Sequence, residues 1–227
     1  MKKGLTEIIL VLDKSGSMSD IRMDSLGGIN TFITEQKKVT GEANLTLVLF
    51  DTTFNTLFNR VNIKDTRTLT EGEYIPSGCT ALLKAVSDTV DEMGKKLTAD
   101  KEEDRPEKVI LVVMTDGHEN SSNSYDGDNL STWTEKTKSK ELRYTKEKLK
   151  VKLEHQQNVY KWKVIYLGAD LTAFDEGTAI GSTSNFAYNA TSLGTKALYK
   201  GINTAVSSYR ETGDIDDSDL KDAQNQK

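Results

Sequence analysis

The stretch "EIILVLDKSGSMSD", residues 7–20, decides the fold because it joins an apolar run to an acidic, hydroxyl-rich corner. Continuous apolarity, without the alternation of a half-exposed strand, is typical of a parallel strand that is covered on both faces. The run ends on Asp13, and Ser15 and Ser17 follow at alternate positions. Gly16 between them lets the chain bend tightly. The stretch therefore predicts a central strand that delivers several side-chain oxygens to one corner.

Other segments of the chain repeat this pattern of strand and helix. Further central strands are predicted at 45–51, 108–116 and 163–170, with edge strands at 52–63 and 184–190. Helical periodicity predicts helices at 19–39, 80–97, 134–157 and 191–210, with Ser19 and Thr191 as N-caps. Segment 52–63 follows its neighbour after almost no turn, which favours an antiparallel hairpin. The alternation predicts a doubly wound α/β sheet that is mostly parallel, with helices on both faces.

Length and composition favour one domain. The chain has 227 residues, of which 36% are hydrophobic, and only two prolines, so nothing marks a linker. We expect a single domain over 1–213, with a polar loop and a lysine-rich helix at about 117–157. The stretch 214–227 is acidic and poor in apolar residues, which predicts a disordered tail.

The charge balance and the single cysteine limit the function classes. The formal net charge is −5, so no basic excess favours binding to nucleic acid or to anionic lipid. No apolar run approaches the ~20 residues that a membrane-spanning helix needs. Cys79 cannot form an internal disulfide, and the N-terminal segment does not resemble a secretion signal. These features predict a cytoplasmic protein that acts without nucleic acid or membrane.

Oxygen-bearing side chains are expected to meet at the edge of the sheet where the parallel strands end. Asp13 and Asp116 both end strands, and the loop "PSGCTAL" at 76–82 brings Thr80 to the same side. The predicted metal ligands are Asp13, Ser15, Ser17, Thr80 and Asp116. Carboxylate and hydroxyl oxygens without imidazole or thiolate suit a hard divalent cation and not zinc. We therefore expect Mg²⁺ there.

Several of these residues also have simpler interpretations. Asp13 alone could be a helix N-cap, and Thr80 could cap the helix at 80–97 while also binding a metal. Cys79 is expected to be a small packing residue, and His118 an exposed loop histidine. Asp126 and Asp128 are expected in a turn, because the rest of an EF-hand loop is missing. Asp51 and Asp170 also end strands and are expected to cap the turns that follow.

The pattern "DKSGS" after a buried strand, "GCT" before a helix and "TDG" after a later strand resembles the metal-ion-dependent adhesion site of von Willebrand factor A domains. The resemblance covers about 5–210 and implies that the sheet is Rossmann-like, with the strand order 3-2-1-4-5-6. It also implies a bound Mg²⁺ or Mn²⁺ and a partner protein that presents an acidic residue. Ser15, Ser17 and Thr80 would be direct ligands, while Asp13 and Asp116 often act through water.

The resemblance also implies a rim that a partner would touch and a setting for the protein. The expected rim residues are Gly16, Met18, Gly78, Cys79, Gly117, His118 and Glu119. Without a secretion signal, the chain resembles intracellular prokaryotic or phage members of the family.

Three functions follow from the sequence; the first is favoured, and the third is a degenerate site that serves only folding stability. The first is a metal-dependent protein-binding module whose Mg²⁺ coordinates an acidic residue of a partner. The alternative is a regulatory or assembly subunit, either of an AAA+ ATPase complex or with a role in a phage virion or in host takeover. Catalysis is not expected, because no Walker A or dinucleotide-binding motif is present and Ser15 takes the place of the second aspartate of haloacid dehalogenase-like enzymes.

Overall fold

One six-stranded sheet forms the centre of the molecule. The computed structural model describes residues 1–123, 142–169, 172–215, 218 and 220. The strands are β1 (Lys2–Asp13), β2 (Glu42–Phe50), β3 (Phe54–Asn62), β4 (Pro106–Thr115), β5 (Lys163–Ala169) and β6 (Ser184–Tyr188). Their order is β3-β2-β1-β4-β5-β6, and only the β2–β3 pair is antiparallel. This confirms the predicted fold class, strand order and edge hairpin.

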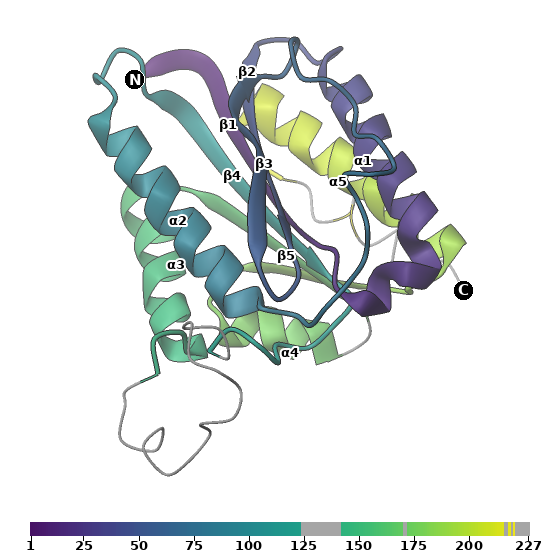
Figure 1. The fold of residues 1–227 in the computed structure, drawn as a ribbon. Coiled ribbons are helices and arrows are strands. Elements are labelled where there is room, and N and C mark those ends of the chain that lie inside the picture. The colour runs from purple at the N-terminus through teal and green to yellow at the C-terminus, as the bar shows by residue number, and fades with distance from the viewer. Residues whose placement is uncertain (124–141, 170–171, 216–217, 219, 221–227) are drawn as a thin grey trace.

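Helices cover both faces of this sheet (Figure 1). They are the 3₁₀ helix η1 (Gly16–Ile21) and the α-helices α1 (Arg22–Gln36), α2 (Leu82–Ala99), α3 (Lys146–Tyr160), α4 (Thr172–Ala179) and α5 (Ser192–Thr212). Buried side chains form one core beneath α1 and α5 and a second beneath α2 and α3. The sheet therefore has a covered helix layer on each side.

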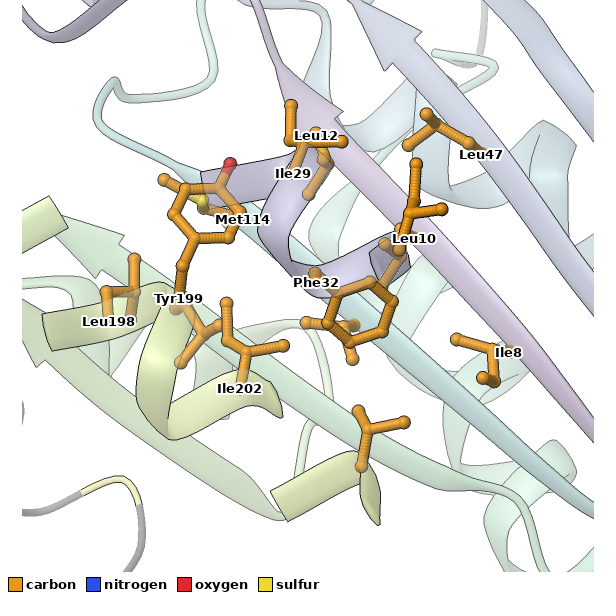
Figure 2. Packing of buried hydrophobic residues seen from close by; sticks show 14 of the residues in the cluster. Ile8, Leu10, Leu12, Ile29, Phe32, Leu47, Met114, Leu198, Tyr199 and Ile202 are labelled. Carbon is orange, nitrogen blue, oxygen red and sulfur yellow. The ribbon is translucent and has the colours of Figure 1, made fainter. Parts of the chain in front are cut away.

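The stretch Ile8–Leu12 of strand β1 is apolar because it contributes to both cores. Ile8, Leu10 and Leu12 belong to the core under α1 and α5, while Ile9 and Val11 belong to the other. Figure 2 shows the first three among side chains of the facing helices. Both sets are almost fully buried. Between Ile8 and Leu12 both sides of the strand are buried and no polar residue alternates with the apolar ones, as the sequence pattern indicated.

Two of the predictions about helix ends are wrong. Ser19 is not an N-cap, because a 3₁₀ turn forms first and its hydroxyl donates to the carbonyl of Gly16 at 2.7 Å. Thr80 does not cap α2, which starts at Leu82 with Ala81 as its N-cap. By contrast, Thr191 caps α5 as predicted and accepts from the backbone N–H of Gly194 at 3.2 Å.

The helical segments after β4 also differ from the prediction. The structure starts α3 at Lys146, where the hydroxyl of Thr145 accepts from the backbone of Lys148, so the predicted helix at 134–157 is wrong over 142–145. Its first part, 134–141, lies outside the described residues. Helix α4 was not predicted, because eight residues that include a glycine carry little periodicity. Most of the predicted tail lies outside the described residues, but Asp214 pairs with Lys163 and Leu220 is buried.

Candidate metal site

Asp13 is held rigidly at the end of β1. Its side chain is fully buried, and its Oδ1 accepts from the backbone N–H of Ser15 at 2.6 Å. Its Oδ2 accepts from the hydroxyl of Thr115, the last residue of the neighbouring strand β4, at 2.5 Å. The backbone carbonyl of Asp13 accepts from the hydroxyl of Tyr74 at 2.7 Å. These bonds tie the corner to β4 and to the loop before α2.

The two serines connect this corner to Asp116. The hydroxyl oxygens of Ser15 and Ser17 lie 3.1 Å apart, and Ser17 donates to Oδ1 of Asp116 at 2.7 Å. Ser15 is buried, whereas Ser17 is exposed at the surface. Residues that are 99 positions apart therefore meet through one hydroxyl. The structure brings Asp13, Ser15, Ser17 and Asp116 together, as the sequence predicted.

Thr80 reaches the same place from the loop before α2. Its position is fixed by two bonds with Asn120, one from the N–H of Thr80 to Oδ1 at 2.9 Å and one from the N–H of Asn120 to the carbonyl of Thr80 at 3.0 Å. A Cβ atom built on Gly117 would lie 2.9 Å from the Thr80 hydroxyl and 3.6 Å from that of Ser17. Both hydroxyls thus flank a space that a glycine keeps open.

The carboxylates of the site carry negative charge without a cationic neighbour. Burial raises the pKa of Asp13 to about 6, although its hydrogen bonds from Thr115 and Ser15 oppose this shift. Burial also raises the pKa of Asp116. Lys14 lies between Asp13 and Ser15 in sequence, but its ammonium pairs with Asp51 instead. Of the described residues, no Lys, Arg or His forms an ion pair with Asp13 or Asp116.

The donor set fits a hard cation. It combines two carboxylates with three hydroxyls, which are oxygen ligands of the kind that Mg²⁺ and Ca²⁺ accept. Across the part of the chain that the structure describes, no three His, Cys, Asp or Glu side chains are grouped to hold a metal. A metal at this corner would therefore depend on the hydroxyls as well as on the two carboxylates. These residues therefore suit the Mg²⁺ ion that the sequence analysis predicted, and they suit zinc poorly.

The rim differs from the prediction at two residues, Met18 and Glu119. Gly16 and Gly78 are exposed and Gly117 is half-buried, but Met18 is fully buried in the core and cannot touch a partner. Cys79 is exposed rather than packed. The carboxylate of Glu119 accepts from backbone N–H groups of Leu83, Ser121 and Ser122, so it caps the start of α2.

The remaining predicted residues are placed as follows. His118 is exposed as expected, with Nδ1 3.6 Å from Oε1 of Glu176. Asp51 caps its turn as predicted, because its Oδ1 accepts from the backbone of Thr53 at 2.8 Å. Asp126, Asp128 and Asp170 lie outside the described residues.

Sequence reasoning missed three residues that support the site. Thr115 could have been noticed, since it is a hydroxyl residue at the end of an otherwise apolar strand. Tyr74 and Asn120 lie in loops, 61 and 40 residues from their partners, and no local pattern marks them. All three hold the ligands in place rather than offering a further oxygen to the corner.

Comparison with solved structures identifies the fold. A mutant of the PilB minor pilin from Streptococcus sanguinis has a TM-score of 0.61 at 14% identity, over 91% of this chain and 62% of that one. The vWF domain of the type V pili tip protein Mfa5 from Porphyromonas gingivalis gives 0.59 at 14% identity, over 93% and 98%. A von Willebrand factor type A protein from Catenulispora acidiphila gives 0.54 at 12%, over 89% and 43%. The chain therefore has the fold of von Willebrand factor A domains, while spanning less than two thirds of the pilin.

Two comparisons at the level of sequence found no relative, and the helices were also considered as membrane spans. No protein-family model matches the sequence, and no curated protein does. Among the described residues, no helix combines the length and apolarity that crossing a membrane requires.

Proposed function

We propose that the protein is a metal-dependent protein-binding module whose Mg²⁺ site takes an acidic residue of a partner. One observation carries the proposal: two carboxylates and three hydroxyls converge at the carboxyl edge of the sheet without a cationic side chain of the described residues to balance them. Such a cluster is costly to bury unless a cation completes it. The fold supports this placement, because ligands of open α/β sheets bind at this edge.

The residues that would hold the ion are Ser15, Ser17, Thr80, Asp13 and Asp116. Bound there, Mg²⁺ would supply a positive centre with an affinity for one more anionic oxygen. The three hydroxyls are neutral, so the protein balances the charge of Mg²⁺ only where both carboxylates lie close to the ion. Asp13 uses both carboxylate oxygens for bonds to Ser15 and Thr115, which holds it behind the hydroxyls. The arrangement favours a carboxylate from outside.

Access from solvent supports a protein partner. Ser17 is exposed, and Gly16, Gly78 and Cys79 around it are exposed as well. Because the glycines have no side chains, a partner's Asp or Glu can approach this surface without a steric clash. The cytoplasmic, prokaryotic or phage setting stays a prediction of the sequence.

Calorimetric titration of Mg²⁺ and Mn²⁺ into chelator-treated protein tests the site. We expect one saturable site in the wild type and its loss in Asp13→Ala and Thr80→Ala. Asp20→Ala is the matched control, because Asp20 is an exposed acid close to the site in sequence and its loss changes the net charge equally. Equal Mg²⁺ binding by all four proteins would contradict the proposal.

A second titration tests the acidic partner. If a carboxylate completes the coordination, a short Glu-containing peptide should raise the affinity for Mg²⁺, and Mg²⁺ should raise the affinity for the peptide by the same factor. The Gln-containing peptide is the control. We expect no catalysis, and Mg²⁺-dependent hydrolysis of a phosphate ester that Asp13→Ala abolishes would contradict that expectation.

A further inference from the structure

A large cleft lies at the opposite edge of the sheet from the candidate metal site. It has a volume of about 710 Å³ and opens between the C-terminal parts of α2 and α3, beside the first residues of β4 and β5. Figure 1 shows these two helices side by side, with the end of α2 close to the N-terminus. The volume is within the range of pockets that hold small molecules, roughly 300–1,000 Å³. No residue of the candidate metal site lines this cleft.

The floor of the cleft is apolar and contains aromatic rings. Val90, Val109 and Trp162 line it and are buried, and Tyr160 lines it with 59% of its surface exposed. The Tyr160 ring meets the His155 ring edge to face at 5.5 Å between centroids. The exposed rings of Tyr160 and His155 offer flat surfaces to a ligand, while Trp162, only 4% exposed, closes the base of the cleft. Aromatic contacts of this kind add to the gain from burial.

Gly94 keeps the cleft open on the side of α2. It is an interior residue of that helix and lines the cleft, and a Cβ atom built on it would meet no atom within 4 Å. A glycine inside a helix is unfavourable by ~1 kcal/mol relative to alanine. Since no neighbour excludes a side chain here, close packing does not explain this glycine. Its effect is to leave space above the aromatic floor.

Three of the five charged side chains that line the cleft have partners in the described part of the chain. Asp91 pairs with Lys152 at 2.6 Å, and Glu107 accepts from the backbone N–H of Gly4 at 2.8 Å. Arg105 donates to the carbonyls of Asp100 and Thr98, at 3.1 and 2.9 Å. Lys95 and Glu102 add one charge of each sign. The wall therefore has no excess charge that would select an ion.

From the volume, the aromatic floor and the balanced wall, we propose that this cleft binds an uncharged, ring-containing small molecule. The ring would lie against Trp162 and Tyr160 beside Gly94. A charged analogue should bind more weakly, because the cleft would remove its water without supplying a counter-charge. This inference is independent of the metal site.

Nuclear magnetic resonance of the Trp162 indole N–H tests the ligand class. The sequence has two tryptophans, so Trp133→Phe leaves Trp162 as the only indole signal. The probes are 2-naphthalenemethanol, 2-naphthoate and 2-naphthylmethylammonium, which share a ring and differ in charge. We expect a saturable shift with the neutral probe and binding weaker by about fivefold or more with both ions. Equal or tighter binding of either ion would overturn the proposed class.

Gly94→Leu tests the place of binding. The leucine side chain would occupy the part of the cleft beside the aromatic floor without meeting a neighbour at its Cβ, so the fold should persist and the neutral probe should bind more weakly. Gly27→Leu is the control, because Gly27 is an exposed glycine inside α1 whose Cβ space is also open. Unchanged binding in Gly94→Leu, or no shift of the wild type up to the solubility limit, would overturn the proposal. Asp13→Ala should bind the probe like the wild type.

Discussion

Replacing Asp13 by Asn should stabilise the chelator-treated protein and remove its response to Mg²⁺. Burial raises the pKa of this fully buried carboxyl from 3.8 to about 6. A difference of about two pKa units, at 1.36 kcal/mol each, means that ionisation of Asp13 disfavours the folded state by ~3 kcal/mol near pH 7.5. An amide of the same shape avoids this term. The free energy of unfolding should therefore rise by up to ~3 kcal/mol in the variant.

The groups that bond to the Asp13 carboxylate can also bond to the amide of the Asn variant. Its oxygen can keep the bond from the N–H of Ser15, and its nitrogen can donate to the hydroxyl oxygen of Thr115. The Thr115 hydroxyl then turns its hydrogen to the carbonyl of Gly117, which lies 3.0 Å away. Each hydrogen bond of the carboxylate thus has a counterpart in the amide, so the change in charge dominates.

The assay is urea unfolding of both proteins at pH 7.5 and pH 4, with EDTA or with Mg²⁺. The folded-state pKa of Asp13 lies above the unfolded value, so protonation stabilises the wild type as the pH falls through about 6. The advantage of the variant should be full at pH 7.5 and small at pH 4. With Mg²⁺ only the wild type should gain stability. A variant that is less stable than the wild type in EDTA at pH 7.5 would refute the reasoning.

Three further changes test other parts of the structure. Gly117→Ala should weaken Mg²⁺ binding by about tenfold or more in calorimetry, with little loss of stability. The reason is that its Cβ would lie 2.9 Å from the Thr80 hydroxyl. An unchanged affinity for Mg²⁺ would mean that no metal uses this space. Gly28→Ala should lower the free energy of unfolding by ~1–3 kcal/mol, because its Cβ would lie 2.2 Å from the buried ring of Tyr199, which Figure 2 shows. The control Gly27→Ala should raise that free energy by ~0.5–1 kcal/mol. If urea unfolding shows that both variants are more stable than the wild type, this packing is contradicted. Arg60→Ala should destabilise by ~3 kcal/mol at pH 7.5, because it leaves the fully buried Glu7 without its cation. That loss should shrink toward pH 4.5, since burial raises the pKa of Glu7 and its protonated form needs no counter-charge, and a loss equal at both pH values would argue against it.

The sequence predicted the sheet because its main signal is local. Each central strand is an apolar run that ends on a polar residue, and a strand buried on both faces requires that composition wherever it lies in the chain. The four oxygen donors at Asp13, Ser15, Ser17 and Asp116 were predictable for a related reason. The ends of parallel strands meet at one edge, so residues that end strands become neighbours without any information about loops.

The remaining features depend on contacts between distant parts of the chain. Glu7 reads as a polar residue at the start of a strand, yet it is fully buried against Arg60, 53 residues away. The start of α2 is set by Glu119 and Ser122 from the loop after β4, which moves the cap away from Thr80. Met18 follows the metal-site serines in sequence but turns into the core, because η1 tightens the chain there. Each case needs the position of a second segment, which a local pattern does not contain.

Gly94 is a further residue whose role the local sequence does not reveal. In the sequence it is one glycine within "VDEMGKKL", a stretch with good helical periodicity, and propensity alone would count it as a small defect of the helix. Only the position of α3 beside α2, and of Trp162 beneath both, turns the missing side chain into the opening of a cleft. If the glycine were neutral, Gly94→Ala should simply stabilise the helix by ~1 kcal/mol, as Gly27→Ala should. With a ligand that binds the cleft, the wild type should instead be more stable than Gly94→Ala. Ligand binding adds to the free energy of unfolding of the wild type, and the narrower cleft of the variant gains less from it.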